Sequence, residues 1–322
     1  MSAATLRRFG GPCRRARTRR APHPRRRQVT RCAAACLALL VLGCRPPTPP
    51  APSALPAAST ASACFPVEGL APADRRVAEH LLLRLGDGEA LYTLAGGIKP
   101  LSSDVADLQL RVAPTADSVS LAQLDQLRRV TAALHCGEIG AFVQLFAAPQ
   151  RRADSTLVRS SAVVLYHRRS LRALVERQAP FFAALGVTPA ADPRDLVEAV
   201  EHAERAPRWR GYGHLFGYPD DAVDFFVRAG IEGDRTGQLV PRDFRRIETV
   251  RKFPETRDGP AVLSAFVYAV PKGAPEGDGD RRLRTAAAPA YARYERERAR
   301  FVVADSTGAV ALWRAWLAPR VP

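Results

Sequence analysis

Several signals that mark common enzyme classes are missing from this sequence. It contains no Gly-x-Ser-x-Gly elbow, no phosphate-binding loop and no dinucleotide fingerprint. No motif therefore points to a serine hydrolase, a P-loop enzyme or a Rossmann oxidoreductase. Cysteine is scarce, with six residues in 322 and no Cys-x-x-Cys pair beyond residue 43, which argues against a zinc cluster. We expect neither a metal nor a cofactor.

Acidic residues are absent from the first 43 positions, which hold eleven arginines. These arginines account for most of the formal charge of +16, because the rest of the chain has 37 basic and 32 acidic residues, a net charge of +5. Such a balance is typical of an ordinary protein surface. The basic composition belongs to the leader, and we expect no nucleic-acid partner.

The apolar run in this leader, residues 32–43, is too short to span a bilayer. As a helix, twelve residues reach roughly 18 Å, whereas the hydrocarbon core is roughly 30 Å thick. An arginine-rich segment followed by a short apolar run is the pattern of a signal peptide, here residues 1–43. Arg26-Arg27-Gln28-Val29 loosely resembles a twin-arginine motif, so both the Sec and the twin-arginine export routes stay open.

The leader ends in Val41-Leu42-Gly43-Cys44, which resembles the lipobox of bacterial lipoproteins. In that class a signal peptidase cuts before the cysteine, whose thiol carries a diacylglyceryl group. The family pattern prefers leucine and then a small residue before Gly-Cys, and Val41-Leu42 departs from it. The resemblance implies a palmitate-type anchor on Cys44 that holds the protein at a membrane of the cell envelope, inner or outer, facing the periplasm or the exterior.

Two alternatives to the lipoprotein hypothesis stay open. Cys44 is incidental if a secretory signal is cut elsewhere, and residues 32–43 are an anchor if the leader is not cut at all. Residues 44–63 are rich in proline and alanine and have no apolar face. Because proline favours extended backbone, we interpret them as a tether that reaches up to about 60 Å at roughly 3.1 Å per residue.

Residues 64–322 form the predicted folded body, either as one unit or as a core over 64–230 with an extension over 231–322. Apolar spacing predicts helices from 72 to 85, from about 120 to 136, from 170, from 192, from 219 to about 229 and from 289 to about 301. It predicts strands over 108–112, 139–146, 161–166 and 261–270. The expected class is α/β or α+β, with a small mixed sheet of about four strands flanked by six or more helices.

Three finer expectations concern local structure. Ser120 and Gln123 are expected to form a capping box at the start of their helix. Residues 209–218 are expected to form a loop rich in glycine and aromatic residues, and 242–252 an irregular basic stretch. Cys64 and Cys136 are the two cysteines left after Cys44 and form either a disulfide or two buried thiols.

Two segments carry the main site hypothesis. Leu94-Ala95-Gly96-Gly97-Ile98-Lys99-Pro100 and Phe216-Gly217-Tyr218-Pro219-Asp220-Asp221-Ala222-Val223 are separated by about 120 residues. In this order they resemble a family of small clostridial proteins with a Leu-Ala-Gly-Ile-Lys-Pro segment and a Phe-Leu-Gly-Tyr-Pro segment. The chain departs by the extra glycine at Gly96-Gly97, and by Gly213-His214 where the family has His-Glu. The resemblance implies no activity, only that the two segments belong to one site.

The residue types in these segments suggest a pocket formed by Gly97, Lys99, Tyr166, His214, Tyr218 and Asp221. A glycine pair lets backbone N–H groups approach a ligand, and a helix beginning near Pro219 offers further donors. Lys99 and His214 then lie over an anionic group. The opposing interpretation is a helix cap above an aromatic core, because Asp221 in the first turn already satisfies the helix dipole.

Three functions are compatible with this pattern. The first is a lipid-anchored binding or envelope-associated protein that recognises a small molecule or another protein. The second is a tethered enzyme whose site combines segments 96–100 and 211–221, and a close His214–Asp221 pair beside Lys99 would favour it. The third is nucleic-acid contact through the basic residues Arg242, Arg245, Arg246, Arg251 and Lys252.

Overall fold

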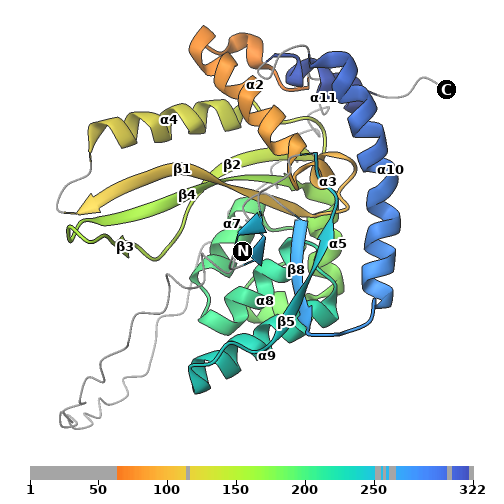
Figure 1. The fold of residues 1–322 in the computed structure, drawn as a ribbon. Coiled ribbons are helices and arrows are strands. Elements are labelled where there is room, and N and C mark those ends of the chain that lie inside the picture. The colour runs from red at the N-terminus through yellow and green to blue at the C-terminus, as the bar shows by residue number, and fades with distance from the viewer. Residues whose placement is uncertain are drawn as a thin grey trace, which may run out of the picture.

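The computed structural model describes residues 64–318 except 114–116, 251–254, 257–258, 261–265 and 303–306. The predicted signal peptide, Cys44 and the tether lie outside the described residues, as do Arg251 and Lys252. The fold is α+β, one of the two predicted classes, with helices on both faces of a four-stranded sheet and a smaller two-stranded sheet (Figure 1).

The main sheet has the strand order β1-β4-β2, with the short β3 pairing with β4. The strands are β1 (Leu101–Ala113), β2 (Ile139–Leu145), β3 (Gln150–Arg151) and β4 (Leu157–His167). Every neighbouring pair is antiparallel, so the expectation of a mixed sheet was wrong. The reason is that β1 and β2 are joined by a helical crossover and run in the same direction, while β4 fills the place between them and runs opposite to both.

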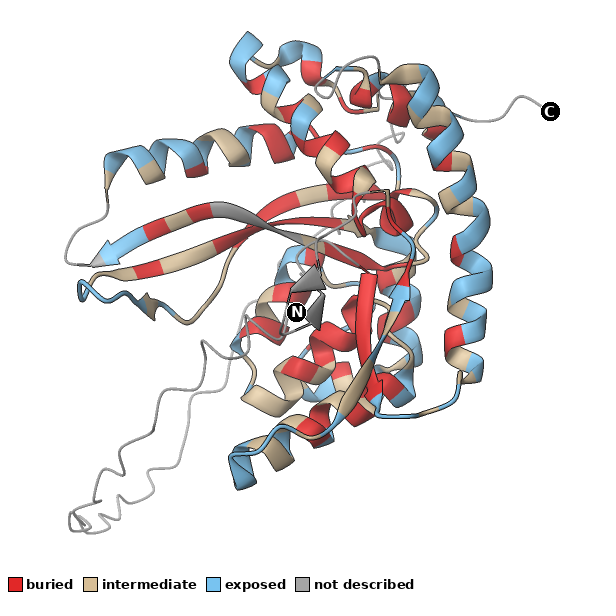
Figure 2. Ribbon diagram, in the orientation of Figure 1, coloured by how far each residue is buried: buried red, intermediate tan, exposed pale blue. Residues whose placement is uncertain are grey.

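The middle of this sheet is buried on both faces, because residues 161–165 of β4 are all buried, whereas the end of β1 is exposed (Figure 2). Val164 on β4 packs with the helices of one face, and its neighbours Val163 and Leu165 pack on the other. This alternation follows from the two-residue period of a strand. One face is covered by α4 (Ser118–Ala132), and the other by α5 (Arg168–Arg177), α6 (Ala179–Ala184), α7 (Pro193–His202) and α8 (Arg205–Leu215).

The N-terminal and C-terminal parts of the body share one apolar core. It joins α2 (Pro72–Asp87) and α3 (Leu91–Leu94), preceded by the 3-10 turn η1 (Val67–Gly69), to α10 (Asp278–Phe301) and α11 (Ala309–Leu317). The rings of Tyr294 and Trp313 stack with centroids 5.3 Å apart. Arg298 on α10 binds both carboxylate oxygens of Asp87 at the end of α2, at 2.6 and 2.9 Å.

The smaller sheet pairs β5 (Arg242–Ile247) with β8 (Phe266–Pro271), and it packs against α9 (Asp220–Thr236). A separate short pair joins β6 (Glu255–Thr256) and β7 (Gly259–Pro260). The irregular stretch expected at 242–252 is therefore a strand over its first six residues. The expectation failed because β5 is only partly buried and pairs with a strand about 20 residues later, so the apolar pattern is weak.

The loop expected at 209–218 is largely helical, because α8 continues to Leu215. A Cβ at Gly211 would lie 2.7 Å from Val200 of α7, and a Cβ at Gly213 would lie 2.8 Å from Val223 of α9. These glycines allow three helices to approach closely, rather than allowing a turn.

Two helix starts also differ from expectation. Asp117, not Ser120, caps α4, because its carboxylate accepts a 2.8 Å hydrogen bond from the Ser120 N–H. The long helix begins at Asp278 rather than near Pro289, which lies in its interior. The Asp280 carboxylate accepts a 2.9 Å hydrogen bond from the Gly277 N–H and so stabilises the earlier start.

A disulfide joins Cys64 to Cys136, 72 residues apart in sequence. It links the first described residue to the junction between α4 and β2. Next to it, Arg314 of α11 donates hydrogen bonds to the carbonyl oxygens of Cys64 and Phe65, at 2.7 and 2.6 Å. The start of the body is therefore fixed both to the α4–β2 junction and to the C-terminal helix α11.

Candidate functional site

The two sequence segments of the site hypothesis lie in direct contact. Gly217 ends α8 with φ +69°, and its N–H donates to the His214 carbonyl at 2.9 Å. The Tyr218 N–H donates to the Gly213 carbonyl at 3.1 Å, which completes a Schellman motif. A Cβ at Gly217 would lie 3.1 Å from Cδ of Pro100. The C-terminal end of α8 therefore packs closely against the segment that carries Lys99.

Lys99 is fully buried, and its ammonium lies 2.7 Å from Oε2 of Glu89. Three ring centres surround the ammonium nitrogen, at 4.3 Å for Phe266, 5.1 Å for Phe216 and 5.6 Å for Tyr218. Burial lowers the pKa of Lys99, and the Glu89 carboxylate opposes that effect. The lysine is therefore a structural cation inside an aromatic cage and does not reach a ligand at the surface.

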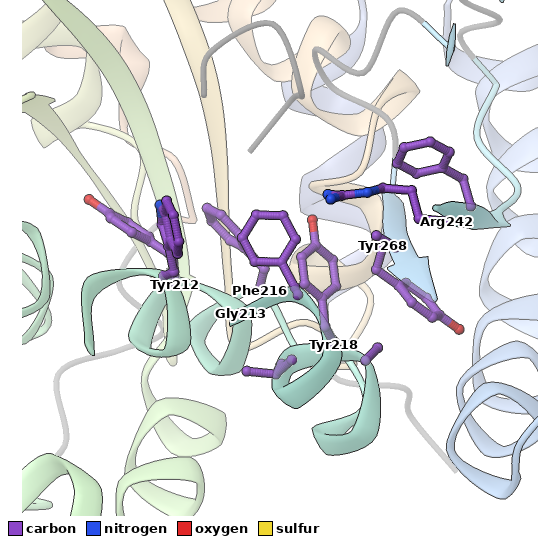
Figure 3. A pocket seen from close by; sticks show the side chains of 12 residues that line it. Tyr212, Gly213, Phe216, Tyr218, Arg242 and Tyr268 are labelled. Atoms are coloured by element: carbon purple, nitrogen blue, oxygen red, sulfur yellow. The ribbon is translucent and has the colours of Figure 1, made fainter. Parts of the chain in front are cut away.

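A pocket opens beside this cage, between α8 and α9 on one side and β5 and β8 on the other (Figure 3). Its cavity volume is about 50 Å³. Seven of its twelve lining residues are aromatic, so its walls are mainly ring faces. The lining residues are Trp209, Tyr212, Gly213, Phe216, Tyr218, Ala222, Val223, Phe226, Arg242, Phe244, Tyr268 and Ala269.

Two of the three tyrosines in the wall use their hydroxyl groups elsewhere. The Tyr212 hydroxyl donates to Oε2 of buried Glu201 and accepts from Nε2 of Gln144, both at 2.8 Å. The Tyr268 hydroxyl donates to Oδ1 of Asp280 at 2.7 Å and points away from the pocket in Figure 3. These bonds fix the two rings in place, and the pocket meets their carbon faces.

Tyr218 forms the wall between the pocket and the lysine cage. Its ring lies 6.0 Å from that of Phe266 and 5.6 Å from that of Tyr268, centre to centre. Burial and the nearby Glu89 carboxylate raise the pKa of Tyr218, so its hydroxyl keeps its proton. Its hydroxyl makes no hydrogen bond to any other residue that the structure describes.

Arg242, at the start of β5, supplies the only formal charge among the twelve lining residues. Its Nε donates to the Val240 carbonyl at 3.0 Å, which fixes the direction of the side chain. Partial burial lowers the pKa of Arg242. Within the described ranges, no carboxylate lies within ion-pair distance of its guanidinium. In Figure 3 the guanidinium extends toward the hydroxyl end of Tyr218.

His214 lies in the same helix as the pocket wall but does not line the pocket. Its side chain is buried, with Nδ1 3.4 Å from Oδ1 of Asp220 and the ring edge-on to Phe181 at 5.7 Å. Burial lowers the pKa of His214, and the Asp220 charge opposes the shift. The structure therefore does not bring His214 over an anion site with Lys99, nor does it pair His214 with Asp221.

The remaining predicted residues also lie outside the pocket. Gly97 packs on the start of α5, where a Cβ would lie 2.1 Å from Oγ of Ser170. Tyr166 accepts a 3.3 Å hydrogen bond from Arg168 at the end of β4. Asp221 is exposed in the first turn of α9. Of the six predicted pocket residues, only Tyr218 lines the cavity, because the close packing of Gly97 and the burial of Lys99 leave no space beside them.

Partial signals for the residues that were missed are present in the sequence. Phe266 and Tyr268 alternate along β8, as expected for one face of a strand, and both reach Tyr218. Arg242 was considered only as part of a basic stretch for nucleic acid. Glu89 lies ten residues before Lys99, and no local spacing rule connects the two.

Two general features of the described residues bear on chemistry and location. They contain no group of three or more histidine, cysteine or acidic side chains arranged to hold a metal ion. None of their helices combines the length and apolar character needed to cross a bilayer. Comparison of the chain with protein-family models, curated proteins and solved structures gave no match.

Proposed function

We propose that this chain is a lipid-anchored extracytoplasmic binding protein that holds a small, mainly apolar ligand in the pocket between α8, α9, β5 and β8. The observation that carries the proposal is the composition of the pocket wall, in which seven rings meet and a single cation lies at the edge. Concave sites with mostly apolar walls and few polar groups are typical of small-molecule binding. Lys99 and Gly217 lie outside the pocket and hold Tyr218, one of its wall residues, in position.

The same wall favours binding over catalysis. None of the twelve described residues that line the pocket is a histidine, cysteine, serine, lysine or acid. A tethered enzyme using segments 96–100 and 211–221 would need a base or nucleophile facing its substrate. His214 faces Phe181 and Asp220 instead, and Lys99 is bound to Glu89.

The binding function is tested by a thermal-shift screen of the purified full chain against small aryl and alkyl carboxylates, amines and their neutral analogues. We expect compounds that raise the melting temperature of the wild type to lose this effect in Phe244→Ala, because Phe244 lines the pocket and is partly exposed. Phe181→Ala, which removes a ring outside the pocket, should keep the effect. A screen without stabilising compounds, or equal effects in all three proteins, would reject the proposal.

The anchor is tested separately at Cys44, which lies outside the described residues. Metabolic labelling with a fatty-acid analogue should mark the wild type, and Cys44→Ser should lose the label. Cys64→Ser is the matched control, because it removes a cysteine that the proposal does not assign to lipid. Equal labelling of wild type and Cys44→Ser would exclude acylation at this residue.

A further inference from the structure

The wall of the aromatic pocket carries two hydrogen-bond donors with free capacity. The Arg242 guanidinium uses Nε for the Val240 carbonyl, and its terminal nitrogens make no hydrogen bond to another described residue. The Tyr218 hydroxyl likewise makes none within the described ranges. Figure 3 shows the two groups directed toward one another above the rings. The guanidinium only donates, whereas the hydroxyl can donate as well as accept, so an acceptor placed between the two groups can receive a hydrogen bond from each.

Two acidic side chains in the first turns of α9 interact with basic residues outside the pocket. Asp224 binds Arg210 at 2.5 Å, and Asp220 lies 3.4 Å from Nδ1 of His214. Neither lines the cavity. Among the described residues that line the pocket, the only charge is therefore the positive charge of Arg242, and an arginine fork matches the geometry of a carboxylate.

The enclosed volume limits the apolar part of a ligand. About 50 Å³ is room for roughly three to five water molecules, which corresponds to one small ring rather than a fused ring system or a long acyl chain. The walls present ring faces and edges, since Trp209 meets Phe226 edge-on at 5.8 Å and Tyr212 stacks on Phe216 at 5.6 Å. Such walls favour an aromatic guest over a saturated one.

We infer that the ligand of this pocket is a small arylcarboxylate, whose ring lies among the aromatic side chains and whose carboxylate binds Arg242 and accepts a hydrogen bond from Tyr218. The inference rests on the proposed binding function and adds the chemical class of the ligand. Arg242 then recognises the charge of the ligand, and the aromatic side chains of the pocket wall recognise its flat ring.

The test is isothermal titration of the purified full chain with benzoate, benzamide and cyclohexanecarboxylate. Benzamide keeps the ring and removes the charge, and cyclohexanecarboxylate keeps the charge and removes the aromatic ring. We expect benzoate to bind about 10- to 100-fold more tightly than benzamide, because a hydrogen bond to a charged group contributes that range. Cyclohexanecarboxylate should bind more weakly than benzoate.

Arg242→Gln should bring the affinity for benzoate down to that for benzamide while leaving the affinity for benzamide unchanged, which also shows that the variant is folded. The matched control is Arg228→Gln, since Arg228 is exposed on α9 and does not line the pocket. Equal binding of benzoate and benzamide, with no effect of Arg242→Gln, would overturn the inference and leave the binding function intact. Equal binding of benzoate and cyclohexanecarboxylate would overturn its aromatic part. No binding of any of the three probes would count against both proposals.

Discussion

The Lys99 ammonium lies 2.7 Å from Oε2 of Glu89, and its side chain is completely buried. The ring centres of Phe266, Phe216 and Tyr218 lie 4.3, 5.1 and 5.6 Å from the ammonium nitrogen, and Phe216 and Tyr218 also line the pocket. The Lys99–Glu89 ion pair therefore stabilises the position of a pocket wall. A buried charge is costly unless it is paired, which makes this contact sensitive to the loss of either partner.

Removal of one partner of this pair should destabilise the protein strongly. Lys99→Met leaves the Glu89 carboxylate without its cation, and we expect a loss of about 3–5 kcal/mol in the free energy of unfolding, measured by urea denaturation. The double variant Lys99→Met/Glu89→Leu should recover most of this loss, because both charges are gone. Arg128→Met is the control, since its ion pair with Asp125 is exposed and should cost at most about 1 kcal/mol. If the double variant instead lost the sum of the stabilities lost in the two single variants, the two charges would not be coupled.

Gly217 should be less tolerant of a side chain than a glycine of similar backbone conformation. Gly217 and Gly186 have φ values of +69° and +74°, but only at Gly217 would a Cβ meet neighbouring atoms, including the Ile98 carbonyl at 3.3 Å. Alanine at either position adds about 1 kcal/mol or more of backbone strain. The melting temperature of Gly217→Ala should fall further than that of Gly186→Ala. Equal losses would mean that contact with the Lys99 segment contributes nothing.

Stability should decrease in mild acid, and His214 should contribute to this loss together with His167, whose pKa burial also lowers. Burial lowers the pKa of His214 in the folded state below the unfolded value of about 6.5. Between these two values the unfolded chain binds a proton that the folded protein does not, so the free energy of unfolding falls as the pH drops below about 6.5. His214→Gln should flatten this dependence, measured by urea denaturation at several pH values. His80→Gln, at an exposed position on α2, should leave the dependence unchanged, and an unchanged slope in His214→Gln would refute the assignment.

Cys64 and Cys136 should be oxidised to each other in the exported protein. Peptide mapping by mass spectrometry without reductant should recover the cross-linked peptides, and the reduced protein should melt at a lower temperature because the unfolded chain regains entropy. Quantitative alkylation of both thiols without reductant would show that the bond is not formed in the cell.

Elements with strong local signals were predicted correctly. The helical spacing of α2, the helix start expected at residue 192 for α7 and the apolar runs of β2 and β4 predicted their positions within a few residues. Helix α8 was missed because Gly211 and Gly213, which are normally loop signals, serve close helix packing in this fold. The Lys99 segment and Tyr218 were expected to belong to one site, but the contact between them was not predicted.

The pocket itself could not be predicted, because its walls come from residues that are distant in the chain. Trp209 and Phe226 are close in sequence, but Arg242 and Tyr268 reach the cavity only after β5 and β8 have paired. Long-range pairing of two short strands leaves little trace in local periodicity. The buried partner of Lys99 was not identified for a different reason: Glu89 lies only ten residues earlier, but no local spacing rule connects the two.

Photoaffinity mapping with a diazirine-bearing benzoate tests the central claim most directly, because it locates the bound ligand without assuming a function. Mass spectrometry of the full chain should find the label in the peptides that contain α8, the start of α9, β5 or β8, and excess benzoate should prevent the labelling. Arg242→Gln should reduce it and Arg228→Gln should not. Labelling confined to other segments, such as the open polar cavity formed by Gln109 and the hairpin around Arg151, would contradict the account.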